Sequence, residues 1–342
     1  MPIPHGNLII PFPGDSAKYI LFHQTGDYSM PGLVPSKVYY TVVDMNLDGG
    51  LGGVPSNQKN LTAISDTLSA GMAACKHANG RDWWVIAIKD SINLLYKILV
   101  TPTGITSVTS QSFNFPLAYY NASQPTFSPD GKKFAYTNLW TGAFGFHDVR
   151  LFSFDNCTGM FDSLSFINIP QEPGFGIAFS PNSKFLYHSS FTKIYQLNTD
   201  TSDIPASNTV VATYDGYISG DPPNCCATDF WLMYLAANGR IYISSGSGVV
   251  DMHFINYPDS AGLACDVQQH ALPLPCFSVR GNVNHPNYYL GCDTTLGCTP
   301  CYTNVDELSP PDFKFRVYPN PVNDGILNIG YLLPQNKHGI FE

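Results

Sequence analysis

Nine cysteines carry the most readily specified chemistry of this 342-residue chain. Five of them fall within one short stretch: Cys265, Cys276, Cys292, Cys298 and Cys301. Cys298-Thr-Pro-Cys301 has the CxxC spacing of thioredoxin-like redox sites, zinc sites and haem attachment sites. No βαβ pattern surrounds it, Tyr302 stands where haem attachment needs His, and a fourth zinc ligand would have to be Cys276 or His285. We therefore expect structural disulfides, with a metal site and redox chemistry as weaker alternatives. So many cysteines favour an oxidising compartment, and their odd number leaves at least one unpaired.

A second candidate site could bind calcium. Asp44-Met-Asn46-Leu-Asp48-Gly49 places oxygen ligands at alternate positions and glycine at the sixth, like the first half of a calcium loop. The twelfth position is Pro55, so the bidentate Glu of such a loop is absent. A strand end followed by a glycine-rich turn accounts for the same residues. We expect no cofactor, with calcium at Asp44, Asn46 and Asp48 as a weak alternative.

Residues suited to acid–base or nucleophilic catalysis are scattered. The nine histidines form no HxH or HExxH motif, and no Gly-x-Ser-x-Gly or phosphate-binding loop is present. If the chain is an enzyme, its candidates are Asp82, Asp130, His77 and His147, all in segments that resemble strand ends or turns. We assign no catalytic residue and consider an enzymatic activity less favoured than a binding function.

The composition indicates which elements must position these residues. Charged residues make up 13% of the chain and the net charge is −9. Aromatic residues make up 13%, and 29 Gly and 27 Pro accompany them, a combination of strand formers and turn formers that is typical of an all-β protein. The acidic balance argues against nucleic acid as a partner. No run of 18 apolar residues is present, so we expect no membrane span.

A repeat with a period near 50 residues runs through most of the chain. Residues 127–136 and 179–187 each combine an aromatic residue, a Ser-Pro-Asp/Asn turn and an alternating strand, and they start 52 positions apart. Weaker copies lie at 78–86, 235–243 and 13–21. Each unit predicts a small antiparallel sheet that must stack against its neighbours, which favours a β-propeller over a pair of β-sandwiches.

Trp83 and Trp84 are consecutive in one predicted strand, so they face opposite sides of it. We expect one in the core and the other packed between blades, in preference to an exposed position suited to stacking on a sugar.

The Phe127-Ser-Pro-Asp-Gly-Lys132 element resembles the PD40/WD40-like propeller repeat. Together with 43–52, 76–84 and 176–181, it is similar to the propeller region of secreted proteins of Bacteroidota-type bacteria. In those proteins the propeller begins upstream of this chain's first residue. The five repeat units and a closing stretch near 277–290 leave room for one or two more blades, so we expect five recognisable blades of a six- or seven-bladed ring. We expect the propeller at residues 1–291 and a Cys/Pro-rich linker at 292–312.

Residues 315–329 predict two strands joined by a Pro-Asn-Pro corner and an Asn-Asp-Gly turn, the start of a small β-module. This segment resembles the opening of the type A sorting domain of the type IX secretion system. The matching positions are Tyr318, Pro319, Asn320, Pro321, Asn323, Asp324, Leu327 and Ile329. We expect residues 313–342 to be the beginning of such a domain, truncated before its later strands.

These expectations combine into one functional hypothesis. The protein would be a secreted or cell-surface propeller that is exported by the type IX machinery and binds a protein or glycan through its loops. The alternatives are an extracellular hydrolase or lyase with its site in the propeller channel, and a structural or adhesive module of a surface protein.

Overall fold

The computed structural model describes residues 5–27, 34–90, 93–114, 123–140, 146–219, 225–279, 281 and 283–302, and strands at 314–318 and 328–332. Contacts divide the chain into two units, Met1–Tyr302 and Thr303–Glu342. The first unit includes residues 292–302, the first part of the predicted linker.

Five antiparallel sheets of four strands follow one another along the first unit, each with its strands paired in chain order. Blade 1 consists of β1 (Asn7–Pro11), β2 (Lys18–Asp27), β3 (Val34–Asp44) and β4 (Leu61–Ser65). Blade 2 consists of β5 (Leu68–Lys76), β6 (Trp83–Lys89), β7 (Leu94–Thr101) and β8 (Gly104–Ser112). Blade 3 consists of β9 (Ser123–Phe127), β10 (Lys133–Trp140), β11 (Phe146–Asp155) and β12 (Met160–Pro170). Blade 4 consists of β13 (Gly174–Phe179), β14 (Phe185–Ser190), β15 (Lys193–Asn198) and β16 (Thr209–Thr213). Blade 5 consists of β19 (Met233–Leu235), β20 (Ile241–Ile243), β21 (Val249–Ile255) and β22 (Val267–Ser278).

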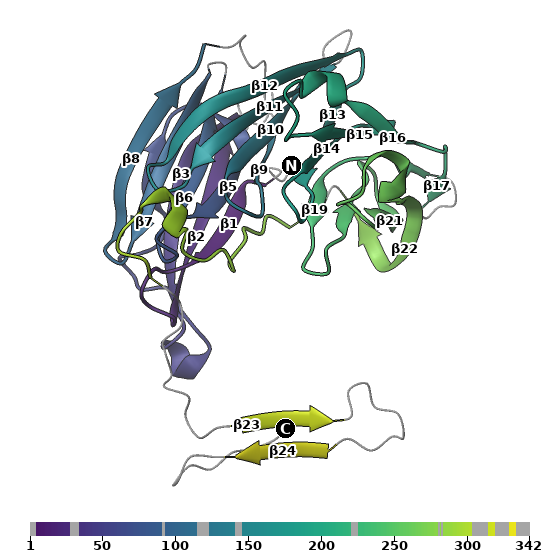
Figure 1. The fold of residues 1–342 in the computed structure, drawn as a ribbon. Helices are drawn as coiled ribbons and strands as arrows, with labels where there is room; N and C mark the ends of the chain where they lie inside the picture. The colour runs from purple at the N-terminus through teal and green to yellow at the C-terminus, as the bar shows by residue number, and fades with distance from the viewer. Residues whose placement is uncertain are drawn as a thin grey trace. The chain divides into compact units, whose positions relative to one another are not determined.

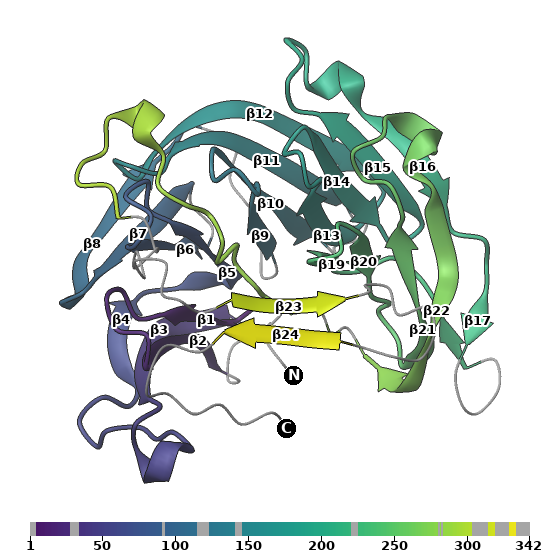
Figure 2. The same ribbon diagram turned by 60° about the horizontal axis from the view of Figure 1, so that its bottom comes forward.

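The first strand of each sheet lies closest to a common axis (Figures 1 and 2). These inner strands contact one another in order, β1 with β5, β5 with β9, β9 with β13 and β13 with β19. The ring is a β-propeller. The all-β propeller and its five blades are thereby confirmed, whereas a six- or seven-bladed ring in the intact protein stays a prediction.

Shorter elements complete the first unit. A two-stranded hairpin of β17 (Ile218–Ser219) and β18 (Cys226–Ala227) lies in sequence between blades 4 and 5. The helical segments are single 3-10 turns: Asp48–Gly50, Pro205–Ser207, Gly262–Cys265 and Thr294–Leu296. No helix within the described residues has the length and apolar character needed to cross a membrane.

Four apolar cores lie between successive blades, because each sheet must cover both of its faces. The strand β6 shows this most directly: Trp83 packs toward blade 1, and Trp84 packs toward blade 3. The Trp84 indole N–H donates to Asn156 O at 2.9 Å. Both indoles are buried in cores between blades. The predicted packing of one Trp between blades is confirmed, and the Trp expected in the core also lies between two blades.

The two strongest sequence repeats fold into the same turn. In blade 3, Ser128 Oγ accepts the backbone N–H of Lys133 at 2.9 Å and donates to the Asp130 carboxylate. In blade 4, Ser180 Oγ accepts the N–H of Phe185 at 2.9 Å and bonds to Asn182 in the same way. The Ser-Pro-Asp/Asn sequence thus closes each hairpin between the first and second strands of a blade.

A cysteine-rich segment, residues 291–302, is attached to blades 2 and 3. Cys157 bonds to Cys298 across 141 positions, and Cys292 bonds to Cys301. The N–H of Tyr302 donates to Asn79 O at 2.7 Å, where the segment crosses the β5–β6 turn. The two cysteines of the CxxC motif therefore have different partners and serve as structural cross-links.

Two of the five expected disulfide cysteines are free thiols in the structure. Cys265 is buried in the core between blades 4 and 5, whereas Cys276 is exposed on β22. Because one thiol lies in the core and the other on the surface, the two do not form a disulfide. The expectation that both take part in disulfides, based on their closeness in sequence, is not met in the structure. A third free thiol, Cys75, is buried.

The second unit contains one antiparallel hairpin of β23 (Lys314–Tyr318) and β24 (Asn328–Leu332). Tyr318 ends the first strand and pairs with Asn328, and Ile329 pairs with Val317. The other residues of the sorting motif lie outside the described residues: Pro319, Asn320, Pro321, Asn323, Asp324 and Leu327.

Candidate functional site

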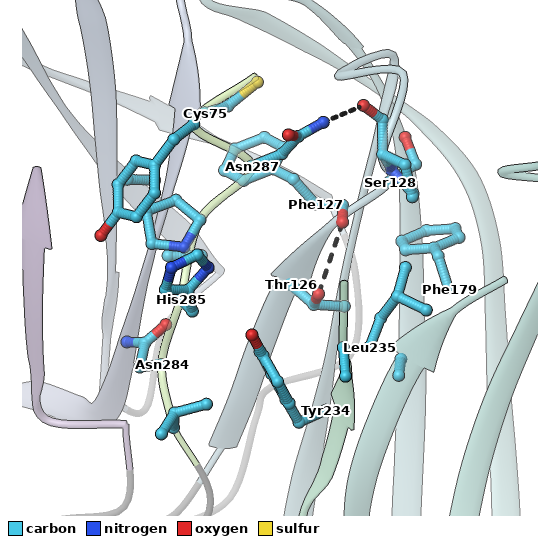
Figure 3. A pocket seen from close by; sticks show the side chains of 18 of the residues that line it. Cys75, Thr126, Phe127, Ser128, Phe179, Tyr234, Leu235, Asn284, His285 and Asn287 are labelled. Carbon is cyan, nitrogen blue, oxygen red and sulfur yellow. Dashed lines mark hydrogen bonds between the residues drawn. The ribbon is translucent and has the colours of Figure 1, made fainter. Parts of the chain in front are cut away.

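An axial cavity of about 310 Å³ lies where the inner strands converge. Its walls come from every inner strand except β1, and from residue 5 and the segment 283–290: residues 73–76, 124–129, 178–179, 181, 233–237, 239 and 283–290. Figure 3 shows side chains from these strands surrounding the space. The ring therefore creates the cavity from residues that are far apart in sequence.

The segment 283–290 forms one wall and ties blade 5 to blades 1, 2 and 3. The Asn284 side-chain amide donates to Met72 O at 2.7 Å on β5, and that of Asn287 donates to Pro129 O at 2.8 Å. The Tyr288 hydroxyl donates to Ile9 O at 2.6 Å on β1. Among the described strands, none of blade 1 pairs with one of blade 5. The hydrogen bonds of the segment 283–290 therefore connect the two ends of the ring and form this wall.

The lining of the cavity combines aliphatic, aromatic and polar side chains with Lys76, and no Asp or Glu is among the described residues that line it. Phe127 and Phe179 supply apolar rings, and Thr126 supplies a hydroxyl (Figure 3). Tyr234 and His285 meet edge to face, with their ring centroids 6.2 Å apart. Aromatic rings and hydrogen-bonding side chains of this kind can stack on a ligand and pair with its polar groups.

Tyr234 and His285 present polar groups to the cavity. The Tyr234 hydroxyl points into the space bordered by Thr126, Asn284 and His285 (Figure 3). Burial raises the pKa of Tyr234 and lowers the pKa of His285, so both side chains are uncharged at neutral pH. Each then offers a donor and an acceptor.

His5 also lines the cavity, and neither of its ring nitrogens has a hydrogen-bond partner within the described residues. Burial lowers the pKa of His5 to about 4, because the charged imidazolium would lose its hydration. An unpartnered buried imidazole is costly unless a ligand or water satisfies it.

None of the four titratable residues nominated from the sequence lines this cavity. Asp82 accepts from the Asn79 amide at 2.8 Å and from the Arg81 guanidinium in the β5–β6 turn. His77 stacks on Trp84 in the same region, and Asp130 belongs to the β9–β10 turn. Asp82 and Asp130 thus form hydrogen bonds within turns, and His77 packs against an indole.

His147 lies between blades 3 and 4 in a buried hydrogen-bonded chain. Its Nδ1–H donates to Glu172 O at 2.6 Å, and its Nε2 accepts from His188 Nδ1 at 3.0 Å. The His188 ring stacks on Tyr195 at a centroid distance of 4.8 Å. His188 Nε2 in turn lies 3.1 Å from Asn208 Oδ1, and the chain joins blade 3 to blade 4.

The buried histidines make stability depend on pH. Burial lowers the pKa of His147 and of His253 to about 4, against about 6.5 in an unfolded chain. Between about pH 4 and 6.5 these imidazoles are therefore protonated in the unfolded chain and mostly neutral in the folded protein. The free energy of unfolding should therefore fall as pH decreases from about 6.5 toward 4, by up to about 1.4 kcal/mol per pH unit for each group.

Urea unfolding of the wild type and of His147→Gln from pH 7 to pH 4.5 checks this expectation. The variant should show a pH slope that is smaller by up to about 1.4 kcal/mol per unit, because one such group is gone. His253→Gln should flatten the slope similarly. Parallel curves for wild type and both variants would contradict the assignment.

The calcium candidates lie in a surface turn after β3. Asp44 Oδ1 accepts the backbone N–H of Asn46 at 2.9 Å, and Asp48 begins a 3-10 turn with its side chain exposed. No group of three or more His, Cys, Asp or Glu side chains among the described residues is placed to hold a metal ion. Asp44 and Asp48 thus take part in a turn, and calcium binding there stays a prediction.

Sequence reasoning missed Tyr234, His285 and the role of the segment 283–290. Asn284-His-Pro-Asn-Tyr288 combines turn formers with hydrogen-bonding side chains, but nothing in that pattern shows that it crosses the ring. Its contacts reach back by more than 270 positions to blade 1.

Comparison with known proteins gives similarity in structure. No protein-family model and no curated protein matches the sequence. The periplasmic gluconolactonase of Pseudomonas aeruginosa is 13% identical, with a TM-score of 0.47 over 75% of this chain and 69% of that chain. A putative 6-phosphogluconolactonase from Bacteroides uniformis is 13% identical, with a TM-score of 0.43 over 79% and 85%. A putative TolB from Agrobacterium tumefaciens is 16% identical, with a TM-score of 0.39 over 82% and 85%. Similarities this low carry no inference about activity.

Proposed function

We propose that this protein is an extracellular recognition module whose axial cavity binds a glycan. The observation that carries the proposal is the combination of aromatic rings, neutral polar groups and the Lys76 ammonium in one cavity without a carboxylate among its described lining residues. Sugar rings present an apolar face that stacks on aromatic side chains, and hydroxyls that pair with amides, imidazoles and phenols. A cavity of about 310 Å³ is at the small end for ligand pockets, which suits one or two sugar units.

The cellular address is part of the same proposal. The Tyr-Pro-Asn-Pro segment at 318–321 resembles a type IX sorting domain, and three disulfides suit an oxidising compartment. We propose that the type IX machinery exports the intact protein to the cell surface or medium. Cell fractionation tests this: loss of the machinery should retain the protein in the periplasm, and unchanged surface or medium levels would contradict it.

Glycan binding is tested by screening the full chain on a glycan array and titrating the best ligand. We expect Tyr234→Ala to weaken that binding at least ~10-fold, about 1.4 kcal/mol, because it removes a stacking ring and a hydroxyl from the cavity. Tyr234→Phe should give a smaller loss, since it removes the hydroxyl but keeps the ring.

Tyr257→Ala is the matched control, because Tyr257 is 58% exposed and does not line the cavity. Its affinity should equal that of the wild type. Equal losses in the Tyr234 and Tyr257 variants, or no binding to any glycan, would overturn the proposal. Binding of a protein partner without any glycan would favour the other recognition hypothesis.

A further inference from the structure

The third disulfide joins neighbours in the chain, Cys225 and Cys226. The other two disulfides span 141 and 9 positions. A cross-link stabilises a fold mainly by restricting the unfolded chain, and the effect grows with the length of the closed loop. Adjacent residues are already held together by the peptide bond, so this disulfide closes no loop and cannot act as a staple.

Adjacency in the chain also sets the backbone spacing of this disulfide, because consecutive Cα atoms across a trans peptide lie about 3.8 Å apart. The Cα atoms of Cys225 and Cys226 are 3.8 Å apart, whereas both other pairs are separated by 5.7 Å. Disulfides ordinarily join Cα atoms about 4.4–6.8 Å apart, and departures from that range make the bond easier to reduce. The Cys225–Cys226 bond is therefore expected to be the most reducible of the three.

Its sulfur atoms lie where a reductant can reach them. Cys225 is exposed and Cys226 is half-buried, as are Cys301 and Cys292 of the short-loop disulfide, whereas Cys298 of the long-range disulfide is buried. Exchange begins with in-line attack of a thiolate on a disulfide sulfur, so access favours Cys225–Cys226 and Cys292–Cys301 over Cys157–Cys298, and the missing loop separates the first two. Of the two residues, Cys225 is the more exposed, so its sulfur is the expected point of attack.

The disulfide is part of a hairpin that is attached to blade 5. Cys226 pairs with Ser219 in the β17–β18 ladder. The Ser219 hydroxyl donates to the Asp251 carboxylate on β21 at 2.6 Å. The hairpin therefore stays on the propeller when the disulfide opens, so the two sulfurs can re-form their bond.

We propose that Cys225–Cys226 is a thiol–disulfide exchange site that accepts two electrons from a dithiol. A dithiol thiolate attacks Cys225 Sγ, the S–S bond breaks, and its electron pair leaves on Cys226 Sγ, which takes up a proton. The second thiol of the reductant then attacks the mixed disulfide and releases Cys225 as a thiol. The dithiol becomes a cyclic disulfide, and the protein gains two electrons and two protons.

Graded reduction of the full chain with dithiothreitol, followed by alkylation and peptide mass spectrometry, tests this. We expect half of Cys225 and Cys226 to be alkylated at a dithiothreitol concentration at least ~10-fold below that needed for either other disulfide. Exposed Cys276 should be alkylated without any reductant. Removing dithiothreitol and adding oxidised glutathione should restore the Cys225–Cys226 bond.

Paired serine variants separate a chemical role from a structural one. Cys225→Ser with Cys226→Ser should leave the urea midpoint of unfolding unchanged, since no loop is opened. Cys292→Ser with Cys301→Ser is the matched control and should destabilise clearly. The proposal is overturned if Cys225 and Cys226 are alkylated before reduction, if they resist reduction as long as the other pairs, or if their serine variant is as unstable as the control.

Discussion

Replacing Cys157 and Cys298 together by serine should lower the free energy of unfolding by about 4–5 kcal/mol. The disulfide spans 141 positions, so its loss frees a very long loop in the unfolded chain. It also anchors the segment 291–302 to blade 3, through the turn that follows β11. Urea unfolding under non-reducing conditions, followed by tryptophan fluorescence, measures the change.

Cys292→Ser with Cys301→Ser provides the comparison for this prediction. Its disulfide spans 9 positions, for which the same chain-entropy argument gives about 2–3 kcal/mol. The long-range variant should therefore be the less stable of the two. The reverse order would show that local packing of the segment, and not restriction of the unfolded chain, determines its contribution.

Trp84→Ala should destabilise the propeller by about 3–5 kcal/mol. The side chain is 5% exposed and fills the core between blades 2 and 3. A Cβ placed on Gly159 would lie 2.7 Å from the Trp84 ring, which shows how closely the turn of blade 3 covers it. Removing the indole leaves a cavity that neighbouring strands, held by their ladders, cannot fill.

Trp84→Phe separates packing from the hydrogen bond. It keeps most of the apolar contact and loses the bond to Asn156 O, so its cost should be smaller, near 1–2 kcal/mol. Tyr257→Ala, at an exposed site, should stay within about 0.5 kcal/mol of the wild type. A Trp84→Ala effect as small as that of Tyr257→Ala would mean that the indole does not hold the two blades together.

Local sequence determined the blades of this protein. Ser128-Pro-Asp-Gly131 and Ser180-Pro-Asn-Ser183 each carry the side chain that closes their hairpin, so the turn is encoded within a few residues. Trp83 and Trp84 must face opposite sides of a strand because side chains alternate, and a sheet with two apolar faces must be covered on both. Such short-range rules are sufficient for the architecture.

Tertiary structure decided the site and the disulfide pairing. Tyr234 and His285 meet because a segment after the last blade crosses the ring and bonds to Ile9, Met72 and Pro129. Cys298 bonds to Cys157, which lies far outside the cysteine-rich stretch, while Cys276 stays free. Contacts over such separations depend on how the blades close around the axis. Because each blade obeys the same local rules wherever it stands in the ring, nothing in a single repeat specifies which distant residues will face one another.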